Sequence, residues 1–368
     1  MIDPGEMPVY SSPRGSMPLS PLLLLLPSLA NAAEVTELAP QYRGDLGFRY
    51  DSFTQYDRLY EDGEQVGKRQ LSSSQLTLAG AFSFIDGAGL FFEIPRLSDR
   101  ISYSEANSMA FDPNSDSGTM LGTDALSGTL GLEGAGFGGS WIGLRGTPIH
   151  EDLFAHRGDR SSWLFEAGYR FADKTHLWAV DGGQRGAGAG ASAYRLHGAF
   201  STTHRASRPY LTATFLQSGR LSTDVTNETG TIISNAEISP ASRMDLKTGT
   251  EVFVWIDDAS SSQLSLDFSA SFGYRSWQTI PSGTYLPSIL DASQSVLILE
   301  SETTSLDLGF GINARIMEYA QLNIGGEIGT ISPQRIEHLY SIETAPGTLD
   351  WQLHVEARFR ARDPLFGE

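Results

Sequence analysis

The sequence contains no cysteine and no apolar run long enough to form a membrane-spanning helix. Without cysteine, the chain can form no disulfide, thiolate catalyst or cysteine metal site. A spanning helix needs roughly 18 consecutive apolar residues, so a membrane form of this chain must be a closed barrel of strands. Basic residues are also scarce, with 26 Lys and Arg against 44 Asp and Glu. The resulting net charge of −18 disfavours nucleic acid as a partner.

The N-terminus has the features of an export signal. A short apolar stretch, Leu22–Leu26, is followed by Ala30–Ala32, a small-x-small pattern typical of a secretory cleavage site. We interpret residues 1–32 as a signal peptide and residues 33–40 as a linker. The signal peptide is irregular because Arg14 is its only basic residue, so a different start codon is one alternative and a disordered Pro-rich terminus is another.

Strict alternation of apolar and polar residues marks the strands, and the stretch Ser305–Ile316 shows it best. Successive side chains of a strand point to opposite faces, so one face here is wholly apolar and the other wholly polar. The same pattern returns in Leu264–Arg275 and Trp351–Arg360. Each stretch supplies the roughly 9–11 residues that a tilted strand needs to cross a bilayer. Aromatic residues lie near several strand ends, as in membrane-interface girdles.

About twelve such strands can be read along the chain. They are expected near Tyr42–Asp57, Lys68–Phe84, Leu90–Ser104, Phe137–Thr147, Ser162–Ala172, Ser192–His204, Pro209–Thr223, Arg243–Asp257, Gln263–Trp277, Thr304–Met317, Ala320–Ile331 and Trp351–Arg362.

The links between these strands alternate between short and long. Asp258–Ser262 and Glu318–Tyr319 are short, whereas Lys174–Ala191, Asp224–Ser242 and Gln278–Thr303 are long. A soluble β-sandwich has no reason to sort its loops in this way, but outer-membrane barrels have short periplasmic turns and long extracellular loops. We therefore predict an all-β fold, a transmembrane antiparallel β-barrel of about 12 strands. It would cover residues 41–362, followed by a periplasmic tail at residues 363–368.

Two segments resemble a known family. The Gly-rich run Gly136–Arg145 is similar to a strand of bacterial outer-membrane transporters of the phenol meta-pathway type. Arg160–Glu166 resembles the charged-x-x-Trp strand start of the same proteins. The resemblance implies an outer-membrane barrel with a transport role and no catalytic residues. The chain departs from the usual barrel ending, because Phe359 is followed by nine further residues instead of closing the last strand.

The residues expected to line the barrel lumen carry both signs of charge and two aromatic rings. These candidates are Phe253, Trp255, Asp267, Arg275, Asp307, Arg315, Glu327, His354, Glu356 and Arg358. One interpretation is a polar pore that selects its solute electrostatically. The alternative is a salt-bridged interior that merely fills a closed barrel. Phe253 and Trp255 raise a third option, a path for neutral or hydrophobic molecules.

A weak calcium-loop candidate lies in a polar stretch, where Asp112, Asn114 and Asp116 place oxygen ligands at alternate positions. The twelfth position of that loop is Thr123 instead of a bidentate glutamate, so an ordinary solvated loop is the better interpretation. The seven histidines show no metal spacing. We expect no cofactor, no resident metal and no enzymatic activity.

The sequence thus predicts a passive channel or transporter for small molecules, with neutral or hydrophobic solutes as one class. The alternative is a structural or adhesion-type barrel with a closed lumen, acting through its extracellular loops. The expected location is the outer membrane of a Gram-negative bacterium. The expected partners are outer-membrane lipid, the small-molecule solute and the barrel-assembly machinery, and nucleic acid is excluded.

Overall fold

The structure is a computed structural model, and its description covers most of the chain after residue 41. The described residues are 42–61, 63–104, 130–149, 159–172, 180–181, 184–185, 190–204, 206–226, 232–257, 259–281, 297–317, 319–337, 341–344 and 348–361. The expected signal peptide, linker, calcium loop and periplasmic tail lie outside these residues.

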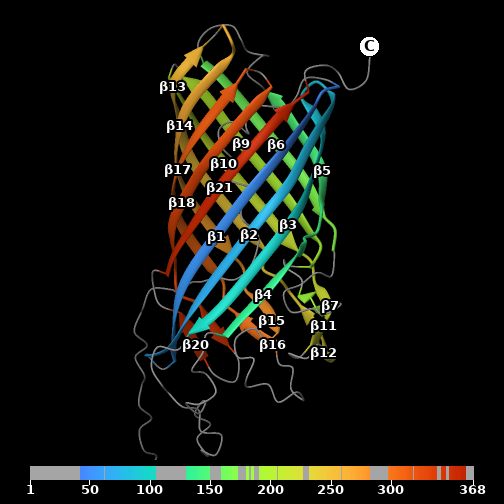
Figure 1. Cartoon of the computed structure of the whole chain (residues 1–368), viewed down its shortest axis with the longest axis vertical. Helices are drawn as coiled ribbons and strands as arrows, with labels where there is room; N and C mark the ends of the chain where they lie inside the picture. The colour runs from blue at the N-terminus through green and yellow to red at the C-terminus, as the bar shows by residue number, and fades with distance from the viewer. Residues whose placement is uncertain are drawn as a thin grey trace, which may run out of the picture.

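Twelve antiparallel strand crossings form one closed barrel (Figure 1). The crossing strands are β1 (Gly44–Glu61), β2 (Glu64–Ile85), β3 (Ala88–Ser104), β4 (Leu130–Phe137) with β5 (Trp141–Ile149), β6 (Asp159–Arg170), β9 (Ala193–His204), β10 (Ser207–Ser218), β13 (Arg243–Asp257), β14 (Ser262–Arg275), β17 (Thr303–Ile316), β18 (Ala320–Ile331) and β21 (Thr348–Arg360).

The barrel closes because the first strand pairs with the last. Leu46 of β1 is opposite Phe359 of β21 on one side and Gly80 of β2 on the other. This seam removes both sheet edges, so the backbone groups of every crossing strand find partners within the wall. The predicted fold class is therefore confirmed. In the part of the chain that the structure describes, no helix is long and apolar enough to span a membrane.

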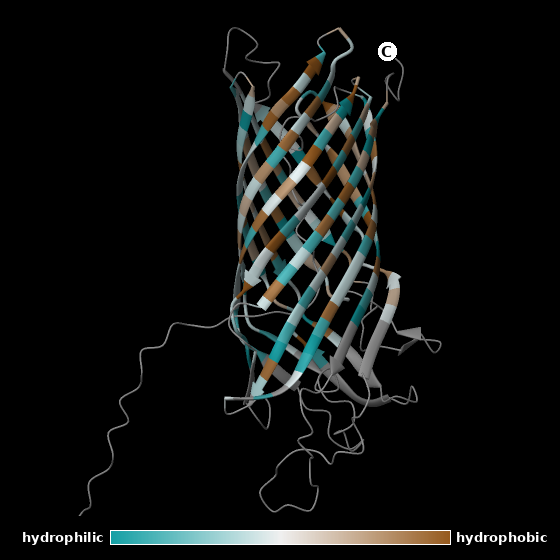
Figure 2. Ribbon diagram, turned by 60° about the vertical axis from the view of Figure 1, so that its left-hand side comes forward, coloured by the Kyte–Doolittle hydropathy of each residue, from teal (hydrophilic) through white to brown (hydrophobic). Residues whose placement is uncertain are grey.

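The outer face of the barrel is apolar. Along β17, Leu306, Leu308, Phe310 and Ile312 are all exposed, and Leu308 leaves 67% of its surface accessible. The alternate residues Asp307, Gly311 and Asn313 are buried on the other face. Figure 2 shows the resulting bands of opposite hydropathy along each strand. Such a surface is stable only in lipid, which places the chain in the outer membrane of a Gram-negative bacterium.

The two ends of the barrel differ in the length of their connections. The link from β2 to β3 is a two-residue turn in which Gly87 has a φ of 75°. A side chain there would also meet the carbonyl oxygen of Thr147 at 2.9 Å, so the turn requires glycine. The short link from β17 to β18 lies at the same end, and long links lie at the other. The short-turn end is the periplasmic one by the rule for these barrels.

The fourth crossing differs from its prediction. We expected one strand over Phe137–Thr147, but the chain forms β4 and β5 with a break at residues 138–140. The N–H of Gly138 donates to the carbonyl of Pro95 at 2.8 Å, and β5 then pairs with β3 and β6. Glycine is needed at this break because a Cβ at Gly138 would overlap the Leu97 side chain and one at Gly139 would overlap the carbonyl oxygen of Phe171. Residues 130–136, which were not part of a predicted strand, also belong to the wall.

The long links contain strands that the sequence did not reveal. The short strands β15 (Gln278–Pro281), β16 (Leu297–Glu300), β19 (Arg335–Glu337) and β20 (Ser341–Thr344) extend the wall at the extracellular end and rejoin β1. Two separate hairpins accompany them, β7 (Val180–Asp181) with β8 (Gln184–Arg185) and β11 (Leu221–Thr226) with β12 (Ile232–Ile238). Consequently β10 ends at Ser218, five residues earlier than predicted.

This orientation predicts which inserted protease sites are accessible in intact cells. A site inserted between Thr226 and Ile232 should be cut by external protease, because β11 and β12 lie at the extracellular end of the barrel (Figure 1). A site inserted between Ala259 and Ser261 should be protected until the outer membrane is permeabilised. Immunoblotting of an epitope-tagged chain measures both cleavages. Equal cleavage of the two sites in intact cells would show that the orientation is wrong.

Candidate functional site

Contacts between strands that are not neighbours identify the inner face of the barrel. Lys247 Nζ of β13 donates to Glu327 Oε1 of β18 at 2.8 Å, although β14 and β17 lie between these strands. The hydroxyl of Tyr210 on β10 donates to Asp267 Oδ2 on β14 at 2.9 Å, across β13. Side chains converge in this way only on the concave side of a curved sheet. The charged faces of these strands therefore point into the lumen.

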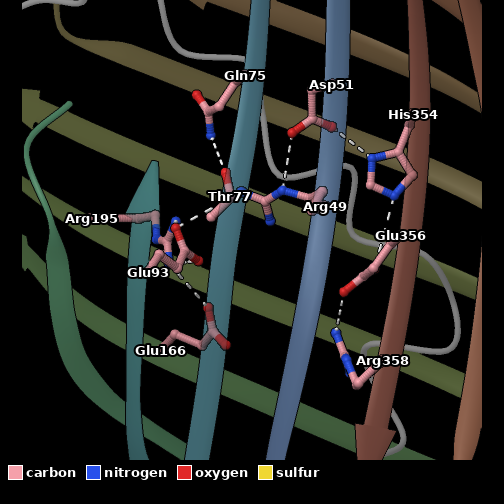
Figure 3. Close-up of polar contacts among 10 residues, drawn as sticks. All are labelled: Arg49, Asp51, Gln75, Thr77, Glu93, Glu166, Arg195, His354, Glu356 and Arg358. Carbon is pink, nitrogen blue, oxygen red and sulfur yellow. Dashed lines mark hydrogen bonds and ion pairs between the residues drawn. The ribbon is translucent and has the colours of Figure 1, made fainter. Parts of the chain in front are cut away.

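The most extensive feature of this inner face is a chain of alternating charges, which we call the charge belt. Its nine members, in order of contact, are Arg145, Glu166, Arg195, Glu93, Arg49, Asp51, His354, Glu356 and Arg358. They come from β5, β6, β9, β3, β1 and β21. Figure 3 shows all of them except Arg145.

Arg195 links the Arg145–Glu166 pair to the rest of the belt. Its guanidinium donates two hydrogen bonds to the Glu93 carboxylate, at 2.9 and 3.2 Å, and lies 3.8 Å from Glu166 Oε2. Glu166 also accepts a hydrogen bond from Arg145. The Arg195 guanidinium further stacks over the rings of Phe91 and Trp141, at 5.1 and 4.9 Å from their centroids. Bidentate pairing and aromatic stacking are the interactions for which arginine is suited, so Arg195 is a fixed element of the lumen.

The other end of the belt crosses the seam between the first and last strands. Arg49 Nε donates to Asp51 Oδ2 at 3.0 Å, and Arg49 Nη2 lies 3.9 Å from Glu93 Oε2. His354 places Nδ1 2.7 Å from Asp51 Oδ1 and Nε2 3.8 Å from Glu356 Oε2. Charged residues on strands β1, β3 and β21 are thereby linked into one network (Figure 3).

Cavities of very different size adjoin the belt. A cavity of about 30 Å³ is lined by Glu93, Arg145, Glu356 and Arg358 with neighbouring wall residues. A second cavity, of about 10 Å³, lies between Arg315 and Arg358. Volumes of this size hold a water molecule or two and no larger solute. A third cavity, of about 700 Å³, is lined by Arg145 and Glu166 together with mostly apolar residues of the wall. The belt is therefore narrowest beside Glu356 and Arg358.

The rest of the inner wall, on β10, β13, β14, β17, β18 and the extracellular half of β21, is acidic, and we call it the acidic wall. Four cations on it bind carboxylates: Arg208 contacts Glu251 at 3.4 Å, Arg243 contacts Asp245 at 2.8 Å, Lys247 contacts Glu327, and Arg275 lies 3.8 Å from Glu300. Three further carboxylates, those of Asp267, Asp307 and Asp350, have no ion-pair partner among the described residues. The charge on the inner face is thus distributed unevenly around the lumen.

Nine of the ten lumen candidates lie on the inner face. Phe253 lies under the Arg208 guanidinium at 5.2 Å, and Arg275 Nη2 lies 3.8 Å from Glu300 Oε2. Arg315 shares a cavity with Arg358. The remaining six are Asp267, Asp307, Glu327, His354, Glu356 and Arg358, which belong to the charge belt or the acidic wall.

The tenth candidate, Trp255, was placed on the wrong face. The ladder between β13 and β14 shifts at Val254, so that Phe253 is opposite Ser265 and Trp255 is opposite Leu264. This β-bulge inserts one residue, so the residues after it point to the opposite face from the one that strict alternation predicts. Trp255 consequently lies on the outer face, where it is 51% exposed. Alternation alone cannot locate a bulge inside a run that is apolar at every position.

Sequence reasoning missed Arg49, Asp51 and Glu93, although a signal for them exists. In β1, Leu46, Phe48 and Tyr50 alternate with the inner residues Arg49 and Asp51. The calcium-loop residues lie outside the described part of the chain. Within the described ranges, no group of three or more His, Asp or Glu side chains is arranged to hold a metal ion.

Comparison with known proteins finds similarity in barrel shape and not in sequence. No family model matches the chain, and no curated protein matches its sequence. An outer-membrane channel of Pseudomonas putida F1 is 13% identical over 90% of this chain and 100% of that one, with a TM-score of 0.48.

Two other solved structures are similar at a lower level. A FadL homologue of Pseudomonas aeruginosa is 10% identical over 86% of this chain and 90% of that one, with a TM-score of 0.38. The outer-membrane protease OmpT of Escherichia coli is 6% identical over 86% and 96% of the two chains, with a TM-score of 0.32. These likenesses concern the barrel architecture, and the function has to be argued from the inner wall.

Proposed function

We propose that the barrel is a passive channel for small hydrophilic solutes across the outer membrane, with the charge belt as its constriction. The observation that carries this proposal is the ionised inner wall, whose ion pairs lie on strands all around the barrel, from β1 to β21. Ionisable residues at membrane depth are costly and typically line the paths of ions and polar solutes. A barrel that needed only a filled interior would be at least as stable with apolar side chains there.

Hydrophilic solutes are favoured over apolar ones. The hypothesis of an apolar path depended on Phe253 and Trp255 acting together, and Trp255 faces lipid. Phe253 alone, covered by Arg208, leaves no continuous apolar lining on β13. We also propose that the barrel acts without catalysis, because the acids and bases of the belt neutralise one another in ion pairs instead of converging on a space for a substrate.

Conductance across planar lipid bilayers tests the proposal. The double variant Glu356→Gln/Arg358→Gln removes an ion pair of 3.0 Å from the constriction. The double variant also removes the contact of Glu356 with His354, which keeps Asp51 as its partner. We expect a severalfold higher single-channel conductance and a weaker dependence on salt concentration, since fewer fixed charges remain to be screened.

The control has the same chemistry in a different place. Arg220 and Glu237 form a pair at 3.0 Å at the extracellular end, and their side chains are 76% and 58% exposed. Glu237→Gln/Arg220→Gln should leave conductance close to wild type. An equal rise in both variants would argue against the belt as the constriction.

A closed barrel that acts through its extracellular loops is the second candidate. The small cavities beside the belt favour it. Absence of conductance in the wild type and in both double variants, with correct folding shown by heat-modifiable mobility on gels, would make this the better account.

A further inference from the structure

The acidic wall carries an excess of oxygen atoms that have no hydrogen-bond donor among the described residues. Five of its inward side chains, each at least nine-tenths buried, have such an oxygen: Asp267 Oδ1, Asp307 Oδ1, Asn313 Oδ1, Asp350 Oδ1 and Gln352 Oε1. They lie on β14, β17 and β21 and are spread along the length of these strands. A buried acceptor without a donor is destabilising, so each of these oxygens requires water or a cation as its partner.

Two of these oxygens converge at one point. Asp307 is opposite Gly329 in the ladder between β17 and β18, and Gly329 is opposite Asp350 in the ladder between β18 and β21. The two carboxylates therefore flank a residue without a side chain. A Cβ at Gly329 would overlap the Asp307 carboxylate and would lie 2.8 Å from Asp350 Oδ1. The Asp307 carboxylate thus occupies the space above Gly329, close to Asp350 Oδ1.

Hydrogen bonds hold the Asp307 carboxylate in this orientation. Its Oδ2 accepts bonds from the hydroxyls of Ser271 and Ser305, both at 3.2 Å, which leaves Oδ1 directed at Gly329. The nearby Lys247 ammonium is bound to Glu327 at 2.8 Å. Gln352, two residues along the same face from Asp350, adds a neutral oxygen without a donor.

We propose that Asp307 and Asp350 form a cation-binding subsite on the inner wall, and that the acidic wall is the path of small inorganic cations through the channel. The path rests on the proposed channel function, but the subsite does not. Carboxylate and amide oxygens are the ligands preferred by hard cations such as Ca²⁺, Na⁺ and K⁺. With only two carboxylates, the site binds weakly and its ion completes its shell with water. Weak binding suits a permeating ion, which must enter and leave.

The first test measures ion selectivity. In a KCl gradient across a planar bilayer, the wild type should show a reversal potential of the sign expected for K⁺ preference. Asp350→Asn should reduce that preference, and Asp307→Asn/Asp350→Asn should bring the permeability ratio towards one. Asp99→Asn is the matched control, because Asp99 is a buried inward carboxylate on β3 that accepts a bond from Ser73 at 2.7 Å. It should retain most of the K⁺ preference.

The second test does not depend on conduction. Millimolar CaCl₂ should raise the thermal unfolding temperature of the detergent-solubilised full chain, because an ion that binds the folded state stabilises it. The rise should be lost in Asp307→Asn/Asp350→Asn and kept in Asp99→Asn. Gly329→Ala leaves the charge unchanged but places a methyl group where the Asp307 carboxylate lies. It should displace that carboxylate and so also reduce the rise in unfolding temperature. A simple net-charge effect would leave Gly329→Ala like the wild type.

The outcomes separate the two proposals. A channel that conducts, with selectivity and calcium response unaffected by the Asp307 and Asp350 substitutions, overturns the subsite and leaves the channel function intact. A barrel that does not conduct but loses its calcium response in these variants overturns the channel function and retains the subsite. Equal effects of Asp99→Asn and Asp350→Asn in both tests would attribute the selectivity to total charge and overturn the subsite.

Discussion

Replacing Arg195 with methionine is expected to lower the free energy of unfolding of the barrel by about 3–5 kcal/mol. Arg195 pairs with Glu93 through two hydrogen bonds and also contacts Glu166. Methionine keeps much of the side-chain length over Phe91 and Trp141 but removes the charge. Glu93 would then be left buried, with Arg49 at 3.9 Å as its remaining ion-pair partner. A buried carboxylate that loses its hydrogen-bonded partner costs more than the ion pair contributed.

The measurement is equilibrium unfolding in urea of the barrel reconstituted in lipid vesicles. The double variant Arg195→Met/Glu93→Gln should recover most of the lost stability, because Glu166 still has Arg145 as its partner. Arg220→Met is the exposed control. Arg220 pairs with Glu237 at 3.0 Å, but their side chains are 76% and 58% exposed, so the change should cost less than about 1 kcal/mol. Similar losses for Arg195→Met and Arg220→Met would show that the belt does not behave as a buried network.

The sequence predicted which face of each strand points outward better than it predicted the contacts between the inward side chains. Alternation places apolar residues such as Leu308 and Phe268 outside and charged residues such as Asp307 and Asp267 inside, because the period of two follows directly from strand geometry. The two failures have local causes. At Val254 a bulge reversed the parity, and at Gly138 two glycines interrupted the ladder. Neither feature changes the average hydropathy of its strand.

The pairing of the charged side chains could not be predicted in the same way. Parity assigns His354 to the inner face, but its contact with Asp51 exists because the last strand closes against the first, 303 residues earlier. The contact of Arg195 with Glu93 requires, in addition, the curvature that brings β9 and β3 together across two intervening strands. Register and curvature are properties of the whole closed sheet. A single strand read on its own therefore shows which residues are inside but not which of them meet.

Replacing Leu308 with arginine is expected to cost about 2–4 kcal/mol of folding free energy in lipid. Leu308 lies near the middle of β17 on the outer face, where it is 67% exposed. An arginine at that depth must either place its charge in hydrocarbon or draw water and headgroups inward, and both are unfavourable. The loss should appear in urea unfolding from vesicles and as reduced assembly in the outer membrane.

The matched control uses the same substitution on the same strand and face. Ile316 is the last residue of β17, beside the short periplasmic turn, and it is 57% exposed. Arginine at this position reaches the interface directly, so Ile316→Arg should cost only about 0–1 kcal/mol. The two variants share the new side chain, the strand and the face. The difference between their free-energy costs therefore reports the effect of depth in the bilayer. Equal costs at both positions would mean that Leu308 does not lie near the bilayer midplane, and the position of the barrel in the membrane would have to be shifted along its axis.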